Sequence, residues 1–92
     1  MRVQREQRTS ITIKKAAQRA GVEVRVARHC VEIGLMEKAM TERDLAELRR
    51  VRRLLALGIN LPGVEVILRM RRRIKALHQE LLELERRSRS EG

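Results

Sequence analysis

Residues 11–35 read ITIKKAAQRAGVEVRVARHCVEIGL, and their pattern predicts two consecutive short helices. Its first half spaces small apolar side chains three and four residues apart, which predicts a short helix capped by Thr12 and ended by Gly21. Its second half predicts another helix, whose inward face is formed by Val24, Ala27 and Val31. Two short helices joined by a turn that contains glycine make a helix-turn-helix, and this is the motif that we expect here.

Two further helices are predicted after this motif. Thr41 and Asp44 stand at the spacing of a capping box, which predicts the start of a supporting helix that ends near Gly58. Its inward side chains are Leu45, Leu48, Val51, Leu54 and Leu55. Asn60 then caps a last helix, with Pro62 in its first turn, where a missing N–H does no harm.

The last helix carries apolar side chains at the a and d positions of a heptad: Ile67, Met70, Ile74, Leu77, Leu81 and Leu84. A stripe this narrow, on a helix about 36 Å long, suits a second helix better than the interior of one small domain. We therefore expect a dimerising coiled coil, made with the same helix of another subunit.

The sequence thus predicts an all-α fold. It consists of a winged-helix-like helix-turn-helix that lacks the wing, a supporting helix and a C-terminal dimerising coiled-coil helix. Only four residues lie between Met36 and Thr41, where a wing would stand. The expected segments are a basic flexible arm at 1–10, the helix-turn-helix domain at 11–61, the coiled coil at 62–87 and a disordered tail at 88–92.

The composition limits the classes of molecule that the protein is expected to bind. Of the 92 residues, 22 are Lys or Arg and 12 are Asp or Glu, and the net charge of +10 points to a polyanion. Phe, Tyr and Trp are absent, which argues against RNA-binding modules that stack bases on aromatic rings. A single cysteine excludes an internal disulfide, and the sequence predicts neither a metal site nor a cofactor. No apolar run is long enough to predict a membrane span or a signal peptide.

Residues suited to catalysis are equally sparse. Cys30 follows His29 directly, and adjacent side chains on a helix point about 100° apart, so the two do not form a natural ion pair. We interpret Cys30 as a small apolar core residue, with a reactive or redox thiol as the alternative. The sequence predicts no enzyme activity.

Exposed basic side chains on the helix-turn-helix form a candidate DNA interface. The second helix of such a motif enters the major groove, and here Arg25, Arg28 and His29 are expected on its exposed face. Arg25 and Arg28, three residues apart, should lie side by side and grip guanine edges or phosphates. Three residues of the first helix are expected to hold the DNA backbone: Lys14, Lys15 and Arg19. The alternative is a basic face that is merely solvated.

Residues 11–35, together with TERDLAELRRVRRLLALGINLPGVEVIL at 41–68, resemble the MerR family of bacterial regulators. The stretch LGINLPGVEVIL at 57–68 is similar to the heat-shock repressor HspR branch of that family. The resemblance implies a homodimer with an antiparallel coiled coil, bound to a palindromic promoter site in the bacterial cytoplasm, at the nucleoid. By position it implies DNA contacts by these residues: Thr12, Lys14, Arg25, Arg28 and His29.

The chain departs from the family pattern in ways that keep other functions open. Cys30 stands where the family has a tyrosine, the wing is missing, and the family's effector cysteines are absent. Related MerR-like proteins act as chaperone modulators that bind a J-domain co-chaperone or an Hsp70 complex. An acidic patch would serve that function here: Glu32, Glu37, Glu42, Asp44 and Glu47. A basic coiled-coil adaptor or phage accessory protein is a third interpretation.

Overall fold

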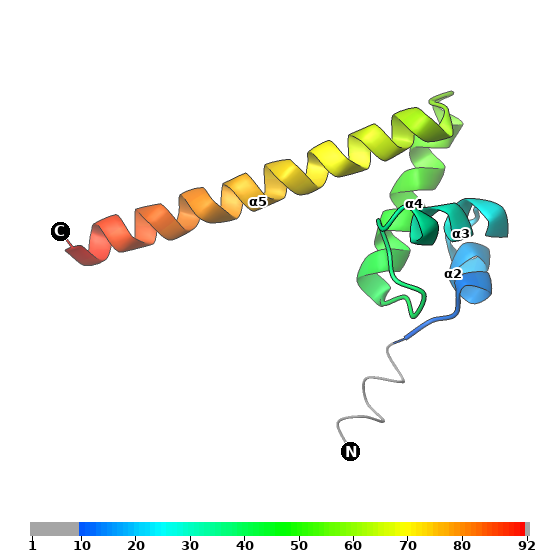
Figure 1. Cartoon of the computed structure of the whole chain (residues 1–92), viewed down its shortest axis with the longest axis horizontal. Coiled ribbons are helices and arrows are strands. Elements are labelled where there is room, and N and C mark those ends of the chain that lie inside the picture. Colours follow the sequence, from blue (N-terminus) through cyan, green and yellow to red (C-terminus); the bar gives the residue numbers. More distant parts are fainter. Residues whose placement is uncertain (1–9, 92) are drawn as a thin grey trace, which may run out of the picture.

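The computed structural model describes residues 10–91, and this part of the chain forms four α-helices (Figure 1). They are α2 (Ile13–Ala20), α3 (Val24–Glu32), α4 (Glu42–Ala56) and α5 (Leu61–Glu91). The first three cluster into a small domain, and α5 projects from that domain as a single long helix. The all-α prediction is confirmed. The expected N-terminal arm lies, apart from Ser10, outside the described residues, as does Gly92.

The ends of α2 follow from local chemistry. The Thr12 hydroxyl accepts a hydrogen bond from the Lys15 N–H at 3.2 Å, which satisfies one of the free donors of the first turn. Gly21 then takes the left-handed conformation, with φ 77°, and its N–H donates to the Ala17 carbonyl. Side chains other than glycine rarely adopt this conformation, so the chain stops the helix here and turns toward α3.

The buried face of α3 differs from the one that the sequence predicts. Val26, Ala27 and Cys30 are buried, whereas Val24 and Val31 are only partly buried. Valines at 24, 26 and 31 allow two apolar stripes on this helix, rotated by less than a quarter turn from one another. The core takes the stripe that places Val26 and Cys30 beneath the helix.

The start of α4 is a full capping box. The Thr41 hydroxyl accepts from the Asp44 N–H at 3.3 Å, and the Asp44 carboxylate accepts from the Thr41 N–H at 3.0 Å. Just before it, Met40 pairs with Ile11 in an isolated antiparallel bridge. This bridge holds the short connection from α3 to α4 against Ile11, two residues before α2.

The core is built from small and aliphatic side chains of all four helices. Ala16 and Ala17 of α2 and Leu45, Leu48 and Val51 of α4 are fully buried. The first two turns of α5 add Val64 and Leu68, which the heptad pattern does not single out. The start of α5 is therefore part of the domain as well as the root of the projecting helix.

Beyond this root, α5 leaves the domain. It runs to Glu91, past Arg87, where the sequence led us to expect a disordered tail. Residues 88–91 contain neither glycine nor proline, so nothing in them interrupts the helix. Its 31 residues correspond to a length of about 46 Å. None of the helices between residues 10 and 91 is long and apolar enough to cross a membrane.

The capping box yields a stability prediction. Replacing Thr41 with alanine removes the acceptor of the Asp44 N–H and should lower the free energy of unfolding by about 1 kcal/mol. Thr41→Ser keeps a hydroxyl and should lose less than about half of that. Urea unfolding at one fixed protein concentration measures both variants. Equal losses for alanine and serine would show that the cap does not stabilise α4.

Candidate nucleic-acid interface

The outer face of α3 carries two exposed arginines. The side chain of Arg25 is 81% exposed, and its Nε donates to a Glu23 carboxylate oxygen at 2.7 Å. Arg28 is exposed and has no hydrogen bond or ion pair with any residue that the structure describes. A partner anion can therefore bind Arg28 without breaking an existing contact, whereas at Arg25 it competes with Glu23.

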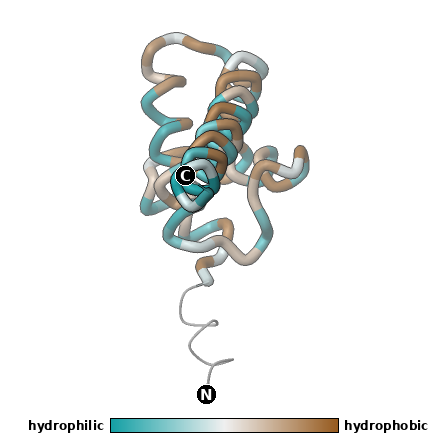
Figure 2. Tube along the Cα trace, turned by 90° about the vertical axis from the view of Figure 1, so that its left-hand side faces the viewer, coloured by the Kyte–Doolittle hydropathy of each residue, from teal (hydrophilic) through white to brown (hydrophobic). Residues whose placement is uncertain are grey.

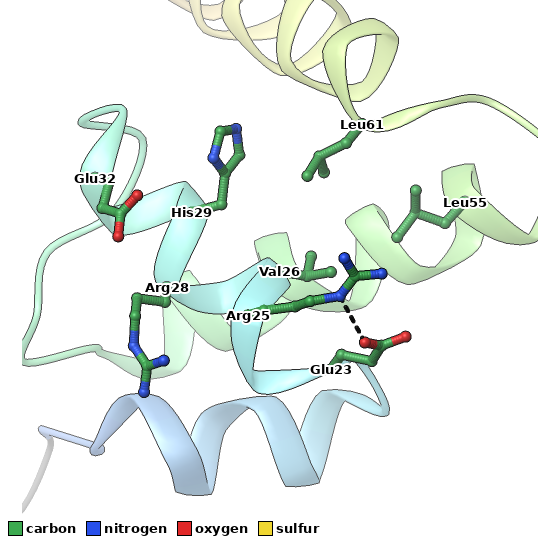
Figure 3. A pocket seen from close by; sticks show the side chains of 8 residues that line it. All are labelled: Glu23, Arg25, Val26, Arg28, His29, Glu32, Leu55 and Leu61. Carbon is green, nitrogen blue, oxygen red and sulfur yellow. Dashed lines mark hydrogen bonds and ion pairs between the residues drawn. The ribbon is translucent and has the colours of Figure 1, made fainter.

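The two arginines diverge rather than lie side by side (Figure 3). Arg28 extends toward α2, while Arg25 extends across an open hollow toward Leu55 on α4. Positions three apart on a helix differ by about 60° in direction, and the ion pair with Glu23 turns Arg25 farther away. The expectation of a paired arginine grip is thus not met in the unbound chain. The two side chains instead cover a wider strip of α3.

His29 turns toward the projecting helix α5 and remains partly exposed. Its side chain is 38% exposed, and its Nε2 lies 4.0 Å from a carboxylate oxygen of Glu65 on α5. Figure 3 shows the imidazole pointing toward the start of α5, away from Arg28. His29 thus turns toward α5, and it still lines one hollow together with Arg25 and Arg28.

The predicted backbone contacts on α2 fall into two groups. Lys14 and Lys15, in the first turn, are exposed and have no ion pair among residues 10–91. Arg19, in the last turn, pairs with Glu42 of α4 at 3.3 Å and so links the two helices. The Thr12 oxygen already accepts a hydrogen bond from the Lys15 N–H. The two lysines are therefore the free cations of this helix start.

Sequence reasoning missed Lys38. The connection that replaces the wing brings Lys38 to a shallow hollow that it lines together with Ser10, Ile11 and Thr12. Because the Ile11–Met40 bridge holds this connection against the start of α2, Lys38 joins Lys14 and Lys15 at one end of the motif. The signal would have been a basic residue in an unusually short loop, but the bridge that places it cannot be read from the sequence.

Between residues 10 and 91, no group of three or more His, Cys, Asp or Glu is placed to hold a metal ion. The site consists of cations on a helix-turn-helix, with Arg28 on the second helix and Lys14, Lys15 and Lys38 beside the first. Cations in this arrangement suit phosphates and base edges.

The fold and these cations define the chain as a helix-turn-helix nucleic-acid-binding protein. A family model described as MerR HTH family regulatory protein matches residues 11–71, more than half of the chain. The protein therefore belongs to the MerR family of DNA-binding transcription regulators. No curated protein and no solved structure gives a significant match.

Cys30 lies behind this interface and yields a prediction about reactivity. It is buried, and this burial raises the pKa of its thiol, with smaller contributions in the same direction from the carboxylates of Glu47 and Glu65. A raised pKa keeps the thiol protonated and unreactive near neutral pH. Alkylation by iodoacetamide at pH 7.5 should be slower in the folded protein than in urea by at least about tenfold. Equal rates would mean that the thiol is accessible.

Proposed function

We propose that the protein regulates transcription as an antiparallel homodimer at the bacterial nucleoid. The α5 helices form the seam of the dimer, and the two α3 helices read the half-sites of a palindromic promoter. The observation that carries the proposal is the row of large apolar side chains left exposed along α5. They are Met70, Ile74, Leu77, Leu81 and Leu84, each between 48% and 63% exposed.

These exposed side chains form an apolar stripe on α5 that faces away from the helix-turn-helix domain. Leu68 is fully buried in that domain, and Met70, two positions later, points about 160° away from it around the helix axis. The stripe repeats along the projecting helix, where apolar and polar residues alternate (Figure 2). No other part of the described chain covers it. A second helix of the same kind would bury it.

An antiparallel register satisfies all six heptad positions. Antiparallel coiled coils pair a positions with d positions, and the chain offers three such layers, each occurring twice by symmetry. They join Ile67 to the partner's Leu84, Met70 to the partner's Leu81, and Ile74 to the partner's Leu77. Each layer is apolar on both sides, so no heptad position is left without an apolar partner.

The charges along α5 favour the same orientation. Residues 69–75 contain five basic side chains and no acidic one, whereas residues 80–85 contain three glutamates and no basic side chain. In the antiparallel register residues 80–85 lie opposite residues 66–71 of the partner, so the two segments overlap in part and Arg73 comes near the partner's Glu80. A parallel dimer would instead set like charges together, with Glu80 near the partner's Glu85.

A two-fold dimer requires a two-fold site. Each subunit presents the same α3 face, so the two contacts on DNA are related by the dimer axis and the preferred sequence is a palindrome. Arg28 contacts base edges or phosphates, and Lys14, Lys15 and Lys38 hold the backbone. The short connection replaces the wing, so phosphate contact near this end of the motif falls to Lys38.

The chaperone-modulator alternative gains no support from the described residues. The acidic patch that would serve it is largely engaged within the chain. Glu42 pairs with Arg19, Glu47 with Arg50 and Arg71, and Asp44 caps α4. An acidic docking face would have to break these contacts, whereas Lys14, Lys15 and Arg28 of the helix-turn-helix have no ion pair among residues 10–91.

The orientation of the dimer can be tested by exchanging charges. Arg73→Glu and Glu80→Arg should each weaken dimerisation by about tenfold, because each places like charges at two symmetric positions. The double exchange should restore the dimer. A parallel dimer behaves differently, since Glu80→Arg would then strengthen it. Sedimentation equilibrium measures the constants, and Arg72→Glu, on the side of α5 away from the stripe, is the charge-matched control.

A failure of the double exchange to restore dimerisation would contradict the antiparallel arrangement. A wild-type chain that sediments as a monomer would contradict the homodimer itself.

The DNA contact can be tested with one arginine on α3 and one on α4. Arg28→Ala should weaken binding to a duplex enriched by the wild type from a random library by about tenfold, the loss of one arginine contact. Arg49→Ala removes the same charge from the exposed face of α4 and should change affinity by less than about twofold. Fluorescence anisotropy at one salt concentration measures both. Equal losses would show that α3 does not read the DNA.

A further inference from the structure

The recognition helix α3 and the dimer helix α5 are joined by a polar tie of three side chains: His29, Glu65 and Arg69. We propose that this tie fixes the angle between the two helices and thereby sets the half-site spacing that the dimer accepts. The inference rests on the proposed function, a dimer that reads paired half-sites. It assigns to Arg69 a positioning role, without contact to DNA.

The tie is centred on Arg69. Its Nη2 donates to the backbone carbonyl of Ile33, at the end of α3, at 3.0 Å. Its Nε donates to a carboxylate oxygen of Glu65, one turn earlier on α5, at 3.2 Å. The other oxygen of Glu65 lies 4.0 Å from Nε2 of His29, in the last turn of α3. Arg69 of α5 thus hydrogen-bonds the carbonyl of the residue that ends α3, and Glu65 orients Arg69 and lies near His29.

Arginine suits this place for two reasons. The last carbonyls of a helix lack partners within it and carry partial negative charge, so a cation at the C-terminal end is favourable. Ile33 is the residue that ends α3, and the chain turns away at Gly34, with φ 80°. A guanidinium also donates in fixed, planar directions, so it can bond the Ile33 carbonyl and Glu65 together, which an ammonium group cannot do with the same geometry.

The tie adds direction to a contact that is otherwise apolar. Val64 and Leu68, on either side of Glu65, are buried in the domain core. Apolar burial is non-directional and permits small rotations at little cost, whereas hydrogen bonds depend on angle as well as distance. The apolar contact therefore holds α5 to the domain, and the tie selects the angle.

A small change of this angle matters for DNA. The tie holds the C-terminal end of α3, while base contacts come from its N-terminal part. A rotation of about 15° about the tied end of this nine-residue helix, about 13 Å long, would move its N-terminal end by about 3.4 Å, one base-pair step. Because the two subunits are symmetric, the shift occurs at both half-sites.

The test compares spacing preferences of the full-length protein. Wild type, Arg69→Ala and Arg72→Ala are each incubated with a pool of palindromic duplexes that differ only in the number of base pairs between the half-sites. We expect the wild type to enrich one spacing. Arg69→Ala should lose that discrimination by about tenfold, equivalent to about 1.4 kcal/mol, while still enriching the same half-site sequence. Arg72→Ala, three residues away on the same helix and without a tie, should behave as wild type.

Two further variants separate geometry from charge and from folding. Arg69→Lys keeps the charge but not the planar pair of donors, so its spacing preference should broaden as that of Arg69→Ala does. Glu65→Gln weakens the tie while leaving Arg69 in place, and should broaden the preference as well. Should Arg69→Ala fail to fold by circular dichroism, these two variants carry the test.

The possible failures are distinguishable. A wild type that enriches no paired half-sites contradicts the proposed function. A wild type with one preferred spacing, retained by Arg69→Ala, contradicts the tie alone. Full recovery by Arg69→Lys shows that only the charge matters and likewise overturns the geometric role.

Discussion

The division of α5 between two sets of contacts governs the rest of the structure. Val64 and Leu68 are buried in the domain, while Met70 and Ile74, two and six residues after Leu68 and turned away from it, are mostly exposed. One continuous helix thus belongs to the domain at its root and, in the proposed dimer, to a partner over the rest of its length. The helix is unbroken from Leu61 to Glu91. A partner that binds the stripe is therefore joined rigidly to the domain.

The parts of the fold that depend on neighbouring residues could be predicted from the sequence. Thr12, Gly21 and the Thr41–Asp44 pair mark helix ends through bonds that span at most four residues, and all three are observed. The buried face of α3 could not be fixed in this way, because its valines permit two stripes. The choice depends on packing against the rest of the domain, which the local pattern does not contain.

The candidate site shows the same limit more strongly. Arg28, Lys14 and Lys15 could be named from the sequence, because their exposure follows from helix periodicity. Periodicity does not predict that His29 turns toward Glu65, 36 positions away. Nor does it predict that Lys38 lies beside Thr12. Both depend on contacts between segments far apart in the chain, and one of these segments is held by a single pair of backbone partners, Ile11 and Met40.

The net charge of +10 takes on a more specific meaning in this arrangement. Five of the basic side chains lie in residues 69–75 of α5, and three of these five have an acidic neighbour in the chain or in the proposed dimer. In the proposed dimer the partner's Glu80 offsets Arg73, while Arg69 and Arg71 already pair with Glu65 and Glu47 of their own chain. These charges then add little to the field that DNA meets. The excess then concentrates on the helix-turn-helix, where Lys14, Lys15, Arg28 and Lys38 have no acidic partner among residues 10–91. Dimerisation would thus double the number of DNA contacts and leave the positive electrostatic field strongest at the helix-turn-helix. Counterion release from DNA depends on such cations, because they are free to contact phosphate.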